Sequence, residues 1–261
     1  MDIAKLVTNV GTAWQRRGSV ADFFRSLAWI YAGALPAALT PREWLIGFRY
    51  PAPVGAVRLW LRSNAGADAF THSEVFERQY YRLPLRAAPA TLLDLGANIG
   101  LSAIYLARLF PGSRLACVEP VADNLRLLAR NLALNGVAAE IIAAAADIRD
   151  GVVVMERQAM DYAHKVAEPT SPAASLFRVS GMSIPSMMRR MGWARINLLK
   201  IDIEGHEKQL FSQDCEWLHD VDALCLEYHH HDAEAELARV ASQFGFAPAI
   251  RLPGHIWFLT R

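Results

Sequence analysis

A seven-residue segment rich in glycine limits the fold of this chain more than any other feature. The segment, DLGANIG, occupies residues 94–100 and follows a short apolar run at residues 91–93 that is typical of a buried strand. The apolar periodicity of residues 101–110 predicts a helix directly after it. Glycines permit close approach of the backbone, and the first turn of a helix offers unpaired N–H groups. The sequence therefore predicts a strand, a ligand-binding loop and a helix in succession.

A second predicted strand ends in an acidic residue shortly after this helix. Residues 115–118 are apolar, and Glu119 and Pro120 follow them. A carboxylate at the carboxyl end of a parallel strand can accept hydrogen bonds from a ribose diol. The glycine segment and Glu119 together predict a nucleoside-cofactor site at the edge of a parallel sheet.

The glycine segment departs from the fingerprint of dinucleotide-binding proteins. That fingerprint has a middle glycine where a diphosphate approaches the backbone, whereas this chain has Asn98 between Gly96 and Gly100. Asp94 would repel phosphates, but a carboxylate suits a ligand that carries a cationic amino group. S-adenosylmethionine has an ammonium, a sulfonium and a ribose but no phosphate, so these residues favour it. A nicotinamide site and a purely structural loop are the alternatives.

Composition argues against several classes of protein. The chain has 261 residues and a formal net charge of +1, so it does not present the basic field that nucleic-acid binding needs. Its three cysteines show no C-x-x-C spacing, which argues against a zinc site and a disulfide framework. No signal peptide is evident, and we therefore expect a cytoplasmic protein.

The first part of the chain, residues 1–85, does not show the alternation of strands and helices that follows it. It predicts a mainly helical cap with one strand at residues 56–62. A helix is expected at residues 71–81, with Thr71 as its N-cap and Glu74 at the spacing of a capping box. The cap either packs as a structural element or takes part in binding the acceptor.

An uncharged run at residues 27–39 is interrupted by Pro36 and is too short to span a bilayer. A buried helix is the structural interpretation of this run. A helix that touches a membrane surface or a lipid-linked acceptor is the functional alternative.

From residue 86 the chain alternates between apolar strands and helices, which predicts one α/β domain with a doubly wound sheet at residues 86–261. The turn residues Pro253 and Gly254 predict an antiparallel hairpin that closes the sheet. Residues 158–175 are expected to form a loop. The expected strands are 91–94, 114–119, 140–145, 152–156, 196–201 and 223–227, and the expected helices are 99–110, 122–135, 205–218 and 232–244.

Charged residues gather where the predicted strand 196–201 ends. Lys200, Asp202 and Glu204 would lie on one side if the strand extends that far. Ligands of open α/β sheets bind beyond the carboxyl ends of strands, so these residues are candidates for a reaction centre. A simple ion pair between Lys200 and a carboxylate is the structural alternative, and Glu207 is expected to be a first-turn helix residue.

The next predicted strand ends at Glu227 and is followed by three histidines at residues 229–231. His229 shares the side of Glu227 and could take a proton from an acceptor hydroxyl, because the pKa of histidine lies near neutrality. A solvated loop side chain is the alternative for each histidine. Asp202, Glu227 and His229 also offer ligand atoms for a divalent ion, which is possible but not predicted.

Taken together, these motifs resemble the FkbM-type family of S-adenosylmethionine-dependent methyltransferases. The resemblance covers roughly residues 57–247, and its most specific part is the segment KIDIEG at residues 200–205. It implies a Rossmann-like class I methyltransferase fold and O-methylation of hydroxyl groups on sugars, glycolipids, polyketides and related natural products. Its carriers are residues 94–100, Glu119 with Pro120, Asn131 with Asn135, residues 200–207, and Glu227 with its trailing histidine.

The resemblance also implies roles for individual residues. Glu119 would hold the ribose of S-adenosylmethionine, and Lys200, Asp202 and Glu204 would line the reaction centre. The alanine-rich residues 143–146 differ from the more polar segment of the family and leave the adenine contacts open. The methionine end of the cofactor would contact Asp94, Gly96, Asn98 and Gly100, and the expected cofactor site also includes Pro120, Asn124 and Asp147.

The sequence thus predicts a methyltransferase that acts on a small-molecule or glycolipid acceptor, without nucleic acid. The methyl donor is already activated, so the protein mainly aligns the reactants, and Asp202 or His229 would accept the hydroxyl proton. A non-catalytic S-adenosylmethionine-binding module would not need the charged set at residues 200–207. A nicotinamide-dependent oxidoreductase is the other alternative, and Asn98 argues against it.

Overall fold

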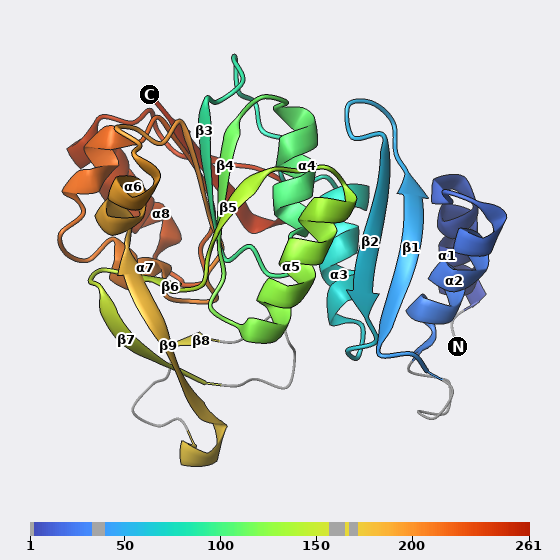
Figure 1. Ribbon diagram of the computed structural model, residues 1–261. Helices are drawn as coiled ribbons and strands as arrows, with labels where there is room; N and C mark the ends of the chain where they lie inside the picture. Colours follow the sequence, from blue (N-terminus) through green and yellow to red (C-terminus); the bar gives the residue numbers. More distant parts are fainter. Residues whose placement is uncertain (1–2, 33–39, 157–164, 167–171) are drawn as a thin grey trace.

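The computed structural model describes residues 3–32, 40–156, 165–166 and 172–261. Its main element is a seven-stranded sheet in the order β5-β4-β3-β10-β11-β13-β12. Three of these strands, β3, β4 and β5, are seen side by side in Figure 1. The first five of these strands are parallel, whereas β13 is antiparallel to both of its neighbours. The bounds are β3 Thr91–Leu95, β4 Arg114–Val118, β5 Ala139–Ile142, β10 Leu198–Ile201, β11 Ala223–Glu227, β12 Ile250–Arg251 and β13 Ile256–Thr260.

Both faces of this sheet are covered by helices, which confirms the predicted doubly wound α/β fold and its closing hairpin. The central strands are buried along their whole length, as expected for parallel strands between two helical layers. Leu92 and Leu93 are neighbours on β3, yet each packs into a different core cluster. The helices are α4 Leu101–Leu109 and α5 Ala122–Leu134 on one face, and α6 Ile184–Met191, α7 Glu207–Leu210 and α8 Ala233–Phe244 on the other.

A second, four-stranded sheet was not predicted from the sequence. Its order is β6-β9-β7-β8, and it follows a turn in which the N–H of Ala144 donates to the carbonyl of Ile142. This turn divides the single strand expected at residues 140–145 into β5 and β6. Most of the expected loop at 158–175 lies outside the described residues. The bounds of the strands are β6 Ala145–Asp147, β7 Gly151–Glu156, β8 Lys165–Val166 and β9 Leu176–Ser183.

The N-terminal region contains helices, as predicted, but it also forms an antiparallel strand pair at one end of the molecule (Figure 1). The sequence indicated β2 but not β1, whose pattern is broken by Gly47. The elements are α1 Ile3–Arg16, α2 Val20–Ile30, β1 Glu43–Arg49, β2 Ala56–Arg62 and α3 Ala67–His72, which continues into a π-helical turn, Ser73–Glu77.

The predicted N-cap at Thr71 is wrong. Helix α3 begins earlier because the side-chain oxygen of Asn64 accepts the N–H of Asp68, which satisfies a first-turn donor. Thr71 lies inside the helix and donates its hydroxyl to the carbonyl of Ala67.

Two asparagines attach the N-terminal region to the main sheet. Asn131 on α5 accepts the N–H of Trp60 at 2.7 Å and donates to its carbonyl at 3.1 Å. Asn135 makes the same pair of bonds with the backbone of Arg58, at 3.0 and 2.7 Å. The side-chain amides thus satisfy the free edge of β2 as a further strand would. Phe76 and Tyr105 also share one core cluster, while a domain boundary at residue 85 stays a prediction.

The apolar run at residues 27–39 begins on α2, and its residues 33–39 lie outside the described part of the chain. Trp29 is buried and donates its indole N–H to the carbonyl of Arg62. Across the described ranges, none of the helices is long and apolar enough to cross a membrane. Contact with a membrane surface stays a prediction.

Candidate active site

A cavity of about 280 Å³ opens at the carboxyl ends of the central parallel strands. Most residues proposed from the sequence lie in its wall. Asp94, Gly100 and Asp147 do not line it, although Asp94 contacts the lining residue Lys200 and Asp147 contacts the lining residue His206. The lining includes Gly96, Asn98, Glu119, Pro120, Asn124, Lys200, Asp202, Glu204, Glu227 and His229.

Asp94 and Lys200 form a buried ion pair between β3 and β10. The Lys200 ammonium lies 3.0 Å from a carboxylate oxygen of Asp94, and the two side chains are 2% and 0% exposed. Burial alone would lower the pKa of Lys200, but Asp94 and Asp202 outweigh it and raise the pKa above its usual value. The carboxylate of Asp94 also accepts the hydroxyl of Ser102 at 2.7 Å. Asp94 therefore supports the loop from below, rather than facing the cavity as a partner for a ligand ammonium.

The glycines of residues 94–100 are required by packing within the protein. A Cβ on Gly96 would lie 1.8 Å from the carbonyl oxygen of Asp202, so only glycine lets the two loops meet. A Cβ on Gly100 would lie 2.8 Å from a methyl group of Leu128 on α5. Both glycines have positive φ. Gly100 thus fixes the helix position, and Gly96 brings the glycine loop against the end of β10.

Glu119 lies at the end of β4 with its carboxylate already oriented. One oxygen accepts the N–H of Asn98 at 3.0 Å, and the other accepts the N–H of Val121 and the amide of Asn124 at 2.9 and 3.1 Å. Burial raises the pKa of Glu119 although these hydrogen bonds oppose the shift. A carboxylate has about four acceptor positions, so capacity remains for a ligand hydroxyl.

The N-terminal region reaches this side of the cavity through Arg62. Its guanidinium pairs with the buried Asp68 at 2.8 Å and donates to the side-chain oxygen of Asn124 at 2.7 Å. A longer contact of 3.5 Å reaches Asn98 in the glycine loop. Asn124 therefore connects Arg62 to Glu119, which ties the cap to the predicted ribose position.

The alanine-rich segment and His206 complete the same wall. Ala144, Ala145 and Ala146 line the cavity, as does His206 at the start of α7. A ring nitrogen of His206 lies 3.0 Å from the carboxylate of Asp147 on β6. Asp147 therefore positions His206.

Four carboxyl groups cluster in the cavity wall beside the ends of β10 and β11: Glu74, Asp202, Glu204 and Glu227. Burial, followed by the charge of Asp202, raises the pKa of Glu204 to about 8. The same two causes raise the pKa of Glu227 and that of Glu74 to about 7. The crowding makes this part of the cavity wall favourable for positive charge or for hydrogen-bond donors.

His229 lies among these carboxylates. Its Nδ1 is 3.0 Å from Glu207, and its Nε2 is 3.8 Å from Glu227 and 3.9 Å from Glu204. Burial lowers the pKa of His229, but the hydrogen bond to Glu207 and the surrounding negative charges outweigh it and raise the pKa to about 9. The pKa of His229 thus lies above the value near neutrality expected from the sequence, because the sequence does not show how many carboxyl groups surround the ring.

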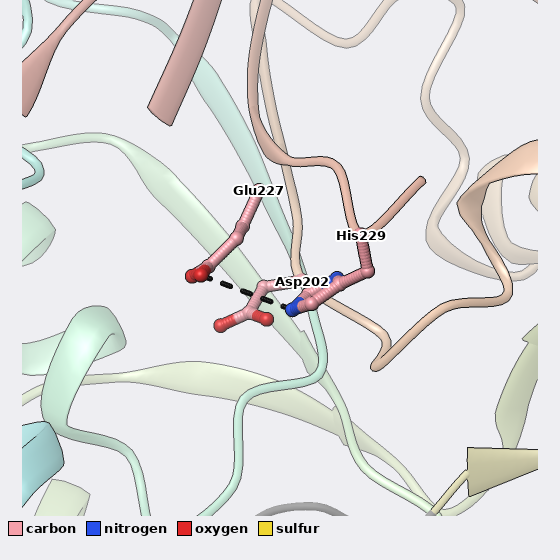
Figure 2. A group of neighbouring side chains, drawn as sticks. All are labelled: Asp202, Glu227 and His229. Atoms are coloured by element: carbon pink, nitrogen blue, oxygen red, sulfur yellow. Dashed lines mark ion pairs between the residues drawn. The ribbon is translucent and has the colours of Figure 1, made fainter. Parts of the chain in front are cut away.

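Asp202, Glu227 and His229 form a compact group at the ends of β10 and β11 (Figure 2). One possible ligand atom from each lies within 4.8 Å of the others. This spacing could suit a divalent ion, but it equally suits a protonated imidazole between two carboxylates. The hydroxyl of Tyr81 also donates to Asp202 at 3.4 Å.

Several lining residues were not expected from the sequence. Tyr80, Tyr81 and Glu74 come from the region before the main sheet, and His255 comes from the closing hairpin. A Cβ on Gly254 would lie 2.1 Å from the ring of Tyr80, so hairpin and cap meet closely. The sequence predicts a turn at residues 253–254 but does not indicate that Tyr80 packs against it.

A family model described as the methyltransferase FkbM domain matches residues 94–250, which is more than half of the chain. The chain belongs to the FkbM methyltransferase family. The match includes every candidate residue from Asp94 to His229, whereas Glu74 and Tyr81 of the cap precede it.

Individual relatives of this FkbM-family chain are similar over part of their length. Methyltransferase sdnD of Sordaria araneosa is 35% identical over 66 residues, which make up 25% of this chain and 26% of that protein. The crystal structure of methyltransferase FkbM from Methylobacillus flagellatus KT matches all of this chain with a TM-score of 0.50 at 14% identity. The chain covers 60% of that structure, so it spans less than two thirds of either relative. The structural similarity confirms the Rossmann-like fold.

Proposed function

We propose that this protein is an S-adenosylmethionine-dependent methyltransferase that acts on a hydroxyl group of a sugar, glycolipid or related natural product. One observation carries the proposal: Glu119 and the glycine loop share a cavity with Asp202 and His229. A residue suited to a ribose and residues suited to proton transfer therefore line the same cavity. The cytoplasmic location is part of the proposal, and the three free, buried cysteines support it.

The residues around the glycine loop fit this cofactor. Glu119 is held by three donors and retains acceptor capacity for a hydroxyl of the ribose. Asp202 supplies negative charge next to the loop, which suits the ammonium and sulfonium groups of the cofactor. When bound, S-adenosylmethionine supplies an activated methyl group. Ala144 to Ala146 offer an apolar surface for an adenine ring.

The carboxyl cluster and the tyrosines in the cavity wall suit an acceptor with several hydroxyl groups. Carboxylates accept hydrogen bonds from hydroxyls, and Tyr80 and Tyr81 add aromatic surface from the cap. His229 would accept the hydroxyl proton in its neutral form, and Asp202 is the alternative proton acceptor. A cation nearby lowers the pKa of an imidazole, so His229 is expected to lose its proton more readily in the cofactor complex.

The competing functions receive less support from this site. A non-catalytic binding module does not account for four carboxyl groups and a histidine in the wall of the cavity. A nicotinamide cofactor would place its diphosphate beside this negative charge, which is unfavourable. The separation of the possible ligand atoms of Asp202, Glu227 and His229 also suits a divalent ion that takes part in methyl transfer.

Replacing Glu119 tests the cofactor assignment. Glu119→Ala should weaken binding of S-adenosylhomocysteine by about 1.5–3 kcal/mol, the typical contribution of hydrogen bonds to a charged group. Glu140→Ala is the matched control, because Glu140 is an exposed glutamate that pairs with Arg190. Calorimetry measures both variants, and equal dissociation constants for Glu119→Ala and the parent would contradict the ribose role.

Methyl transfer to a hydroxyl is tested with radiolabelled S-adenosylmethionine and a set of sugars, glycolipids and polyketides. We expect label that survives alkaline hydrolysis, because an ether is stable where a methyl ester releases methanol. Alkali-labile or amine-bound label would overturn the hydroxyl assignment but leave the methyltransferase assignment intact.

A further inference from the structure

Glu207 is a buried acid that the proposed reaction does not use directly. It is the first residue of α7, and its exposed fraction is 0%. The sequence predicted a first-turn helix residue, which is normally exposed to solvent. Burying a carboxylate is unfavourable unless hydrogen bonds and charges compensate it. The side chain therefore needs an explanation from its partners.

The chain folds around one oxygen of this carboxylate. Oε1 of Glu207 accepts the N–H groups of Ile203 and Gly205, each at 3.2 Å. Glu204 and Gly205 both have positive φ, 56° and 95°, which turns the backbone so that these N–H groups converge. The same oxygen lies 3.0 Å from Nδ1 of His229. Glu207 thus holds its own loop and the histidine together.

The loop of His229 is attached at a second point. A ring nitrogen of His230 lies 2.7 Å from the carbonyl oxygen of Gly205. Two successive histidines therefore contact this part of the chain, His229 at the first residue of α7 and His230 at Gly205 before it. The backbone position of His229 is fixed by His230, and the rotation of its ring is fixed by Glu207.

The contact selects one form of the imidazole. A carboxylate beside Nδ1 accepts a hydrogen bond from it, so the neutral ring keeps its proton on Nδ1 and leaves Nε2 as the acceptor. Nε2 lies on the side of Glu204 and Glu227, both of which line the cavity. Glu207 has no exposed surface and cannot touch an acceptor molecule.

We propose that Glu207 is a positioning residue for His229, which it holds with Nε2 turned toward the cavity. This inference rests on the proposed function, in which Nε2 of His229 accepts the proton of the hydroxyl group that is methylated. The charged groups that face His229 are Asp202, Glu204, Glu207 and Glu227, and Glu207 is the one on the Nδ1 side.

Nitrogen NMR of the labelled protein tests this positioning role without any methyl acceptor. We expect the neutral ring of His229, observed above its pKa, to carry its proton on Nδ1. Glu207→Leu removes the hydrogen-bond acceptor beside Nδ1 and should populate the tautomer with the proton on Nε2. Glu227→Gln is the matched control, because it removes a carboxylate from the Nε2 side and should leave the tautomer unchanged.

The result in the parent protein decides the proposal even if Glu207→Leu does not fold. A neutral His229 with its proton on Nε2 would overturn it, as would an unchanged tautomer in folded Glu207→Leu. Calorimetry with S-adenosylhomocysteine on the same samples reports separately on the proposed function. Because Glu207 does not line the cavity, we expect Glu207→Leu to bind S-adenosylhomocysteine with an affinity within about threefold of the parent, a difference below one kcal/mol. If the parent protein does not bind S-adenosylhomocysteine, that result contradicts the proposed function and does not bear on the positioning role of Glu207.

Discussion

Lys200 and Asp94 are directly opposite each other in the register of β10 and β3, and their charged groups lie 3.0 Å apart. The Lys200 ammonium also donates to the carbonyl of Gly96 at 2.9 Å. The pair therefore fastens the glycine loop to the end of β10. Asp94 was expected to contact the cofactor and Lys200 to line the reaction centre. Together they stabilise the junction between the glycine loop and the end of β10.

Breaking this pair should destabilise the protein strongly. Lys200→Met leaves the Asp94 carboxylate buried without its counter-charge, and we expect a loss of about 3–5 kcal/mol in the free energy of unfolding. The double variant Lys200→Met with Asp94→Asn should be more stable than the single one, because no buried charge remains. Urea denaturation measures all three proteins. A loss below about 1 kcal/mol for Lys200→Met would be typical of an exposed pair and would contradict the account.

The close approach at Gly96 leads to a second prediction. Gly96→Ala should abolish measurable S-adenosylhomocysteine binding, because its Cβ would lie 1.8 Å from the carbonyl oxygen of Asp202 and separate the two loops. Gly112→Ala is the matched control, since Gly112 also has positive φ but no atom within 4 Å of the added Cβ. The control should lose about 1–2 kcal/mol of stability from backbone strain alone and keep its affinity. Equal affinities in the two variants would show that the loops can separate without harm.

The carboxyl cluster predicts that the unliganded protein becomes less stable as the pH rises. The pKa values of Glu204, Glu227 and His229 are raised to about 8, 7 and 9, so the folded protein binds more protons than the unfolded chain. The contribution of His229 is present below its unfolded pKa near 6.5 and is lost as the pH rises through 9. The ionised carboxylates repel one another over the same range.

Urea midpoints between pH 6 and pH 9 measure this effect. We expect the free energy of unfolding to fall by at least roughly 1 kcal/mol per pH unit, since each extra proton bound by the folded protein contributes up to about 1.4. Glu227→Gln should flatten the dependence because it removes one titrating group. A stability that increases from pH 6 to pH 9 would contradict the charge distribution described for the cluster.

The reaction centre is tested by substitution and by metal removal. Asp202→Asn and His229→Ala should each lower methyl transfer by at least ~100-fold, the lower range for loss of a positioned proton acceptor. If His229 is that acceptor, a chelator should leave transfer by the parent unchanged. Inhibition by the chelator, reversed by magnesium or manganese, would instead make Asp202, Glu227 and His229 ion ligands. Parent-level transfer in both variants would place the chemistry elsewhere.

Much of the main sheet could be predicted because its signals are local. The glycine segment and Glu119 each end an apolar run, and topology alone brings the ends of adjacent parallel strands to one edge. The strand β1 was missed because Gly47 interrupts its pattern, and the small sheet was missed because its strands follow an early turn at Ala144.

The pairings inside the site could not be predicted because they depend on register and on distant segments. The sequence placed Lys200 and Asp94 near one site but did not show that they are register partners on the adjacent strands β10 and β3. It also assigned Glu207 to a helix start, since nothing local indicates that His229 lies beside it. Tyr81 is 121 residues from its partner Asp202, so no motif spacing connects them.

Isothermal calorimetry of the purified protein with S-adenosylhomocysteine and with NAD, in separate titrations, tests the central claim most directly. The cavity contains Glu119, the carboxylate that we propose binds the ribose, and a cluster of further carboxyl groups that disfavours a diphosphate. We predict saturable binding of S-adenosylhomocysteine that is weakened in Glu119→Ala, and much weaker binding of NAD. Tighter binding of NAD than of S-adenosylhomocysteine would contradict the assignment of this site to a methyl donor.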